Sequence, residues 1–283
     1  MVYMREVLFS ETHPEYSICM PIYNQEEIIS RVLNGLVKCT HNTYEIIMIA
    51  DCCSDGTVDA VNNWINNLTP PANLCRIVFH TSTTPLFETA CDNICFKSSK
   101  GTYLLEIQAD MEMTQDGYNT HLVKPFHMFS NVIAVGGRCG WSWTNTDCIG
   151  KTGTLLEQPL DSSIDTNTFY IAESTNRGPL LFDHTKLKEM GYLDEKNYFL
   201  GGDEHDVLAR AFFEKGYICG YVPIEFNSDL RWGSTRKGRD AINSQVLARK
   251  RSAHDEFIFM KHYANKTPRR IQKVSMLAPD HAP

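Results

Sequence analysis

Residues 44–51 of the chain are Tyr-Glu-Ile-Ile-Met-Ile-Ala-Asp. The run from Tyr44 to Ala50 is apolar on both faces of an extended chain, which is typical of a central strand in a parallel sheet. Asp51 begins a turn that extends to Thr57. The stretch therefore predicts the centre of an α/β domain, and the neighbouring segments fit around it.

Strand-like and helix-like segments alternate on both sides of this run. Apolar spacing predicts a strand at 17–22 and a helix at 25–38, with Asn24 as the cap of that helix. The segments predicted after the run are helix 58–68, strand 75–80, helix 87–98 and strand 103–107. This alternation is typical of a doubly wound parallel sheet with helices on both faces.

The second half of the chain is less regular. Its polar stretch 140–165 predicts a loop or an edge hairpin. A long amphipathic helix is predicted at 240–263, and the tail 266–283 is expected to be frayed. The other predicted elements are strands 132–135, 180–182 and 218–222 and helices 184–190 and 204–215. Because no linker or repeat interrupts the pattern, we expect a single domain over residues 1–265.

The composition excludes several classes of protein. The chain has 283 residues and a net charge of −7, with 42% hydrophobic and 22% charged residues. These values indicate a folded globular protein without the basic surface typical of nucleic-acid binding. Its ten cysteines form no C-x-x-C pair, so we expect reduced thiols in an intracellular protein.

The sequence also lacks the usual membrane signals. No apolar run reaches the ~20 residues of a membrane-spanning helix. Residues 1–15 carry charges and lack the apolar core of a signal peptide. We therefore predict a cytoplasmic protein with no transmembrane segment, which could be peripheral on the cytosolic face of a membrane.

Polar clusters follow three of the predicted strands, at residues 23–24, 51–55 and 108–112. Ligands of open α/β sheets bind outside the carboxyl ends of the strands, so we expect a site there. Asp110 and Glu112 are two residues apart, and in an extended segment both point to one side. They could hold a divalent cation that bridges a diphosphate, or they could be solvated loop acids.

Two further acidic segments are candidates. Asp51 could accept a hydrogen bond from the base or ribose of a nucleotide, whereas Asp55 is expected to cap the following helix. Residues 201–206, Gly-Gly-Asp-Glu-His-Asp, combine glycines that allow a ligand close to the backbone with acids that suit a helix start. One of these acids could be a general base for an acceptor hydroxyl, and the alternative is a well-capped helix. The basic run that starts at Arg231-Trp232 could neutralise a diphosphate, hold an acceptor or be a solvated loop.

Taken in order, these segments resemble the signatures of family 2 glycosyltransferases of the GT-A fold. Residues 20–26 (Met-Pro-Ile-Tyr-Asn-Gln-Glu) are similar to P-x-Y-N-x-E, and residues 49–57 to V-D-D-G-S-x-D-x-T. Residues 108–110 lie where D-x-D is expected. Residues 177–195 resemble the acceptor-side segment that ends G-x-F-D-E, and residues 202–206 resemble the E-D segment that carries the base.

The resemblance implies an α/β fold of the GT-A (Rossmann-like) type, with a mixed, mostly parallel central sheet flanked by helices. The nucleotide-binding half would lie near 16–115, the acceptor-binding half near 116–235, and the C-terminal helical extension at 240–263. That extension could serve a homodimer, contact the acceptor or dock on a membrane.

The resemblance also implies the reaction. An inverting, metal-assisted enzyme would move a sugar from a UDP- or GDP-type donor to a hydroxyl of a glycan, glycoprotein or lipid-linked acceptor. Asp110 and Glu112 would bind Mn²⁺ or Mg²⁺, and Glu204 is the first candidate for the base, with Asp203 the second. The implied donor contacts are Pro21, Tyr23, Asn24, Glu26, Asp51, Asn93, Gln108, Ala109, Asp110, Arg231 and Trp232. The implied acceptor contacts are Gly178, Pro179, Gly202 and Asp206.

The sequence departs from the family signatures at several positions. Ala50 and Gln108 stand where the family has the first acids of V-D-D and D-x-D. Cys52-Cys53 replaces Gly-Ser, and Asp203-Glu204 inverts the E-D pair. The departures keep a non-catalytic sugar-nucleotide or glycan-binding module open as an alternative. A sugar nucleotidyltransferase is a second alternative, although residues 20–30 lack the Gly and Lys of a triphosphate-binding loop.

Overall fold

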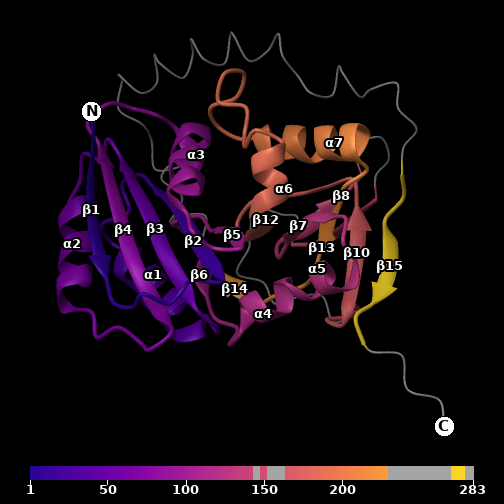
Figure 1. Cartoon of the computed structure of the whole chain (residues 1–283), viewed down its shortest axis with the longest axis horizontal. Helices are drawn as coiled ribbons and strands as arrows, with labels where there is room; N and C mark the ends of the chain where they lie inside the picture. The colour runs from indigo at the N-terminus through magenta and orange to yellow at the C-terminus, as the bar shows by residue number, and fades with distance from the viewer. Residues whose placement is uncertain (143–146, 152–162, 229–268, 278–283) are drawn as a thin grey trace.

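The computed structural model describes residues 1–142, 147–151, 163–228 and 269–277. Within these residues a ten-stranded sheet runs across the molecule in the order β1-β4-β3-β2-β5-β12-β7-β13-β10-β15 (Figure 1). Its strands are β1 Val2–Leu8, β4 Leu74–Ser82, β3 Tyr44–Asp51, β2 Tyr16–Ile22, β5 Tyr103–Glu106, β12 Leu180–Asp183, β7 Val132–Gly136, β13 Ile218–Tyr221, β10 Thr168–Ala172 and β15 Gln272–Ser275. Strands β1, β12 and β10 run against the others. The sheet is therefore mixed and mostly parallel, as the resemblance implied.

The predicted central strand is confirmed as β3. All eight of its residues are buried, and it lies between its parallel neighbours β2 and β4, with Ile47 opposite both Cys19 and Val78. Burial on both faces explains why the run has no polar alternation.

Helices cover both faces of the sheet. On one face lie α1 Ile29–Cys39 and α2 Thr57–Asn67, with the short α4 Tyr118–Leu122 and α5 Lys124–Met128, and they share a core with Ile46 and Met48. On the other face lie α3 Glu88–Ser98, α6 His184–Glu189 and α7 Asp203–Lys215 (Figure 1), which share a core with Ile47 and Ile49. Successive residues of β3 thus face opposite helix layers.

Two small sheets accompany the large one. Strands β8 Cys139–Trp141 and β9 Cys148–Gly150 form an antiparallel hairpin, and β11 Ser174–Thr175 pairs with β8. Of the stretch 140–165, predicted as a loop or an edge hairpin, the described residues up to Gly150 thus belong to a hairpin, while 143–146 and 152–162 lie outside the described residues. Strands β6 Glu112–Met113 and β14 Phe226–Asn227 form the other pair.

The predicted start of the first helix is wrong by four residues. Helix α1 begins at Ile29 rather than Gln25, and its N-terminus has no side-chain cap. Asn24 adopts a left-handed backbone conformation (φ 51°) and bonds to Ser54 instead. The segment 24–28 is tied to the neighbouring loop, which takes it out of the helix.

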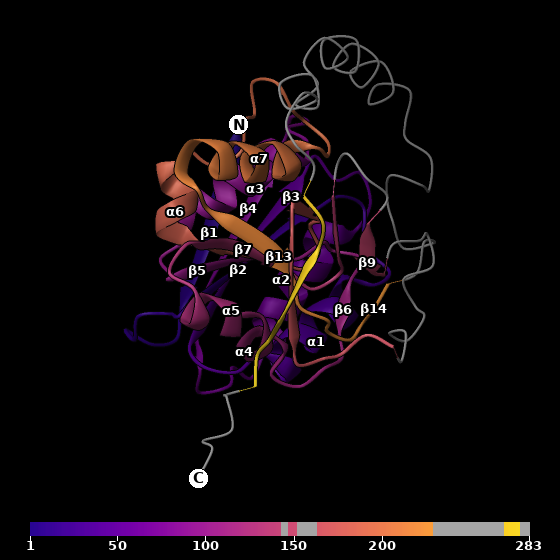
Figure 2. The ribbon, with the colours of Figure 1, turned by 90° about the vertical axis from the view of Figure 1, so that its right-hand side faces the viewer.

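The C-terminal tail is not frayed throughout. Residues Gln272–Ser275 form β15, which pairs with β10 and makes one edge of the sheet. Figure 2 views the molecule from this side, with β15 in front in yellow. The predicted helix at 240–263 lies outside the described residues. Among the helices of the described ranges, none is both long and apolar enough to cross a membrane.

Candidate active site

The loops after β2 and β3 are hydrogen-bonded to each other. Asn24 Nδ2 donates to Ser54 Oγ (3.1 Å), and the Ser54 amide donates to Asn24 Oδ1 (2.8 Å). Glu26 accepts from the Gly56 amide (2.9 Å), and a Cβ on Gly56 would lie 2.5 Å from the Glu26 carboxylate. The end of the segment 20–26, which is predicted to contact the nucleotide-sugar donor, is thus held next to the segment that follows Asp51.

Asp51 and Asp55 have different roles. Both carboxylate oxygens of Asp51 accept backbone amides, from Leu86 and Phe87 (2.8 Å each), so this buried side chain holds the loop before α3. Asp55 Oδ1 accepts from the Thr57 amide (3.0 Å) at the start of α2, but the N-cap position is Gly56 and has no side-chain cap. Asp55 therefore bonds to the first turn from the residue before the N-cap. A contact between Asp51 and a nucleotide stays a prediction.

The segment 108–112 turns directly after β5. Residues 109 and 110 form a turn, so the segment is not extended and strand alternation does not place Asp110 and Glu112 on one side. Glu112 lies in β6, where Arg31 (2.6 Å) and Asn227 (3.2 Å) donate to its carboxylate. Arg31 holds the pKa of Glu112 below its ordinary value through this hydrogen bond.

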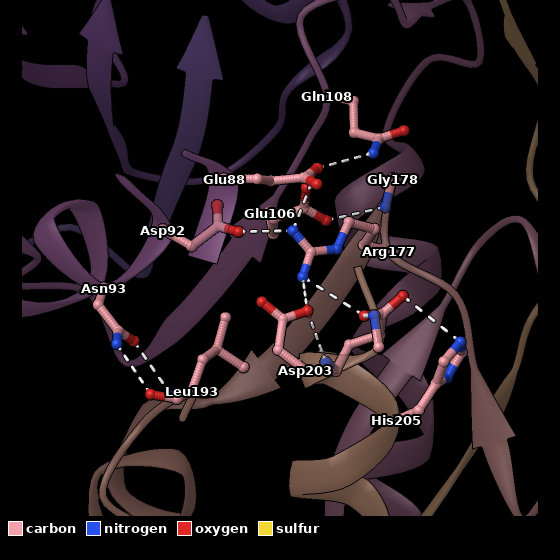
Figure 3. Close-up of polar contacts among 12 residues, drawn as sticks. Glu88, Asp92, Asn93, Glu106, Gln108, Arg177, Gly178, Leu193, Asp203 and His205 are labelled. Carbon is pink, nitrogen blue, oxygen red and sulfur yellow. Dashed lines mark hydrogen bonds and ion pairs between the residues drawn. The ribbon is translucent and has the colours of Figure 1, made fainter. Parts of the chain in front are cut away.

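A buried arginine gathers carboxylates from two helices (Figure 3). Arg177 Nη1 lies 3.1 Å from Glu88 Oε1 and 2.8 Å from Asp92 Oδ2, both on α3. Arg177 Nη2 donates to Asp203 and lies 3.4 Å from Glu204 Oε2, both on α7. The Arg177 side chain is only 6% exposed, so these interactions take place away from solvent.

Glu106 at the end of β5 is a further acid of this group. Its Oε2 accepts the Gly178 amide (2.8 Å), and Gln108 Nε2 donates to Glu88 Oε1 (3.1 Å). We call the six residues Arg177, Glu88, Asp92, Glu106, Asp203 and Glu204 the Arg177 cluster. Burial raises the pKa of Glu106 to about 8 and raises that of Asp92 well above its ordinary value.

Asp203 and Glu204 differ in charge state. Burial raises the pKa of Asp203, but Arg177 and the hydrogen bonds to its carboxylate outweigh this and bring it to about 2. Burial also has the largest effect on the pKa of Glu204, which it raises. Arg177 acts against it, but the adjacent Asp203 adds to it, and the pKa of Glu204 is raised to about 8. Asp203 is therefore ionised at neutral pH, whereas Glu204 exchanges its proton close to that range.

His205 lies on the other side of Glu204. Its Nε2 is 3.6 Å from Glu204 Oε1, its Nδ1 is 2.7 Å from Ser174 Oγ, and the Trp141 ring packs edge-on against it. Burial lowers the pKa of His205 to about 3. The imidazole is therefore neutral, and it contacts Glu204 without adding a charge.

Other residues that were predicted to contact the donor or the acceptor make hydrogen bonds within the protein or lie in loops around the site. Asn93 donates to the Leu193 carbonyl (2.9 Å) and accepts its amide (3.1 Å). Asp206 accepts from Arg210 (2.8 Å). Gly202 precedes α7 with a left-handed backbone (φ 88°). Pro21 is a half-buried residue near the end of β2, and the half-buried Tyr23 follows that strand. Buried Ala109 lies after β5, and Pro179 follows Gly178 through a cis peptide bond. Arg231 and Trp232 lie outside the described residues.

The sequence predicts a metal ion at Asp110 and Glu112. Nowhere in the described ranges do three His, Cys, Asp or Glu side chains come together as a metal cage. A Mg²⁺ ion in an enzyme keeps several waters and takes other ligands from substrate phosphates, so one or two carboxylates suffice. Asp110, in the turn after β5, can be such a ligand for an ion held mainly by a diphosphate.

Sequence reasoning missed most of the Arg177 cluster. Glu88, Asp92 and Glu106 were not candidates, and Arg177 appeared only as part of the acceptor-side segment. No local spacing connects Arg177 to acids 85 and 26 positions away. The available signal was a set of acids in otherwise apolar segments, such as Glu106 at the end of Tyr103–Glu106.

Comparisons with known proteins agree with this architecture. The model of glycosyl transferase family 2 matches residues 17–183, which is more than half of the chain. No curated protein matches the sequence. Three similar solved structures are TarS 1–349 of S. aureus with UDP, the mannosyltransferase PcManGT of Pyrobaculum calidifontis with GDP-Man and Mn²⁺, and GalNAc-T7 with UDP, GalNAc and Mn²⁺.

The three structures share the fold at low sequence identity. TarS has 16% identity and a TM-score of 0.53 over 89% of this chain and 75% of its own. PcManGT has 15% identity and a TM-score of 0.55 over 77% of this chain and 57% of its own. GalNAc-T7 has 14% identity and a TM-score of 0.59 over 78% of this chain and 45% of its own. The chain thus spans less than two thirds of the last two proteins. Given the family match and the ten-stranded sheet, the chain belongs to glycosyl transferase family 2 and is a glycosyltransferase of the GT-A type.

Proposed function

We propose that the enzyme moves a sugar, with inversion, from a UDP- or GDP-type donor to a hydroxyl of a glycan, glycoprotein or lipid-linked acceptor. Glu204 is the general base. The observation that carries this assignment is the position of Glu204 at the start of α7, buried between Arg177 and His205, where its pKa is raised to about 8. A base whose pKa lies near the working pH transfers protons most effectively.

Asp203 is the weaker candidate. It is fully buried and bonded to Arg177, and its pKa of about 2 makes it a poor proton acceptor. In the proposed step the acceptor oxygen forms a bond to the anomeric carbon, and the bond from that carbon to the diphosphate oxygen breaks. The acceptor proton passes to Glu204, and the nucleoside diphosphate leaves.

The donor half has a supporting role. The loops that hold Asn24 and Asp51 flank the carboxyl ends of β2 and β3, where nucleotides bind in open α/β sheets. A Mn²⁺ or Mg²⁺ ion, held by Asp110 and the donor phosphates, would supply positive charge to the leaving diphosphate. PcManGT and GalNAc-T7 are similar structures that contain Mn²⁺, which supports metal use. The role of Glu112 as second ligand, a homodimer and a cytoplasmic location stay predictions.

The test is Glu204→Gln, which keeps the shape of the side chain and removes its basicity. We expect turnover to fall by 10²-fold or more, the range of general-base contributions, while donor affinity measured by calorimetry stays within about twofold. Glu214→Gln is the matched control, because it makes the same change on an exposed position of the same helix. Wild-type turnover in Glu204→Gln would show that the base is another residue.

A further inference from the structure

Arg177 connects two helices that are far apart in the sequence. On its Nη1 side it binds Glu88 and Asp92 of α3, and on its Nη2 side it binds Asp203 and Glu204 of α7. The family match ends at residue 183, so α7 lies beyond the matched region and Arg177 within it. One buried guanidinium therefore ties the helix of the proposed base to α3, which lies in the region that the family model matches (Figure 3).

The two oxygens of Glu204 are in different surroundings. Oε2 accepts the Gly202 amide (3.1 Å) and lies 3.4 Å from Arg177 Nη2. Oε1 is directed toward His205 Nε2 at 3.6 Å. Arg177 and Gly202 thus fix the orientation of the carboxylate through one oxygen, and the other oxygen is the one that can receive a proton.

The groups around Glu204 give Arg177 a specific electrostatic role. Asp203 and His205 face Glu204 from α7, and Cys139 of β8 lies within electrostatic range. Asp203 is negative, and His205 is neutral. Within the described residues, Arg177 is the cation that contacts Glu204. It also faces three other acids of the cluster, and its charge is shared among them.

We propose that Arg177 is a positioning residue, which orients the Glu204 carboxylate toward the acceptor hydroxyl and favours its ionised form. The inference rests on the proposed role of Glu204 as the base. Without the guanidinium, the largest effect that opposes the burial of Glu204 is lost, so the pKa of Glu204 rises further above its present value. An opposite charge at this range shifts a carboxyl pKa by about 1–3 units.

The test compares Arg177→Met and Arg177→Lys. Two quantities are measured: the pH dependence of kcat/KM, and the titration of Glu204 followed by NMR of ¹³C-carboxyl-labelled glutamate. In Arg177→Met we expect both midpoints to move up by about one pH unit or more. The KM for the donor should change little, while kcat at pH 7 falls by about tenfold or more. Arg177→Lys keeps the charge and should show a smaller shift.

The control is Arg76→Met. Arg76 is equally buried, with a side chain that is 7% exposed, and it binds Glu45 and Glu6 in β3 and β1. A loss of packing and charge there should lower the unfolding temperature without moving either midpoint. Unchanged midpoints in both Arg177 variants, or an equal shift in Arg76→Met, would overturn the inference. If Arg177→Met does not fold, the inference is judged on Arg177→Lys. An upward shift of both midpoints in that variant supports the inference, and unchanged midpoints overturn it.

The two readouts separate this inference from the proposed function. If the Glu204 titration moves and the kcat/KM profile does not, Arg177 controls Glu204 but Glu204 is not the base. If neither moves while Glu204→Gln is inactive, the base assignment stands and the positioning role of Arg177 is wrong.

Discussion

The activity of the enzyme should depend on pH through the ionisation of Glu204. Burial and Asp203 raise the pKa of this carboxyl to about 8, against the opposing effect of Arg177. A base with this pKa is ionised in about one molecule in ten at pH 7 and in about nine in ten at pH 9. We therefore expect kcat/KM to rise about tenfold between pH 7 and pH 9.

The assay is release of nucleoside diphosphate at subsaturating donor, measured from pH 6 to pH 10 at constant ionic strength. The dependence of kcat/KM on pH is the suitable quantity because it reports ionisations of the free enzyme. Glu214→Gln should give the wild-type profile, since Glu214 lies exposed at the far end of α7. A flat profile over this range, which a base with the ordinary glutamate pKa of 4.5 would give, would refute the reasoning.

Three further predictions concern the loops around the site. Gly178→Ala should lower the free energy of unfolding by about 1–3 kcal/mol, because φ is 67° there and a Cβ would lie 2.7 Å from Met111 Sδ; an unchanged urea midpoint would contradict this. Asp51→Ala removes the acceptor of two backbone amides and should cost about 1–3 kcal/mol in the same measurement, with Asp51→Asn less affected. Asp110→Ala should abolish the effect of Mn²⁺ on donor affinity in calorimetry, and if Mn²⁺ still raises the affinity, Asp110 is not a metal ligand.

The central fold could be predicted because its strands are buried on both faces. A run such as Tyr44 to Ala50 has no polar residue besides Glu45, and β3 is where the sequence indicated it. The edge strands carry no such pattern. Strand β1, Val-Tyr-Met-Arg-Glu-Val-Leu, has apolar residues but is mostly exposed, so they mark no buried face. Strand β15 is Gln-Lys-Val-Ser, which does not differ from a polar terminus until its partner strand is known.

The candidate site was predictable only in part. Polar residues after β2, β3 and β5 share one edge of the sheet because parallel strands end together, and this argument needs only the order of the elements. The contacts of Arg177 depend instead on how α3 and α7 lie over the sheet. Periodicity gives no information on that arrangement, and so the residue that contacts Glu204 was not recognised.

The charge balance of the Arg177 cluster explains one departure from the family signature. The cluster sets five carboxylates against one guanidinium, and within the described residues Asp92 Oδ1 and Glu106 Oε1 have no hydrogen-bond partner. Gln108 replaces the first acid of D-x-D and donates to Glu88 Oε1 at 3.1 Å. A carboxylate at that position would face Glu88 as a like charge in a poorly solvated region, which is strongly unfavourable. The neutral donor at 108 therefore avoids this repulsion, and it bonds to the same Glu88 oxygen that lies 3.1 Å from Arg177.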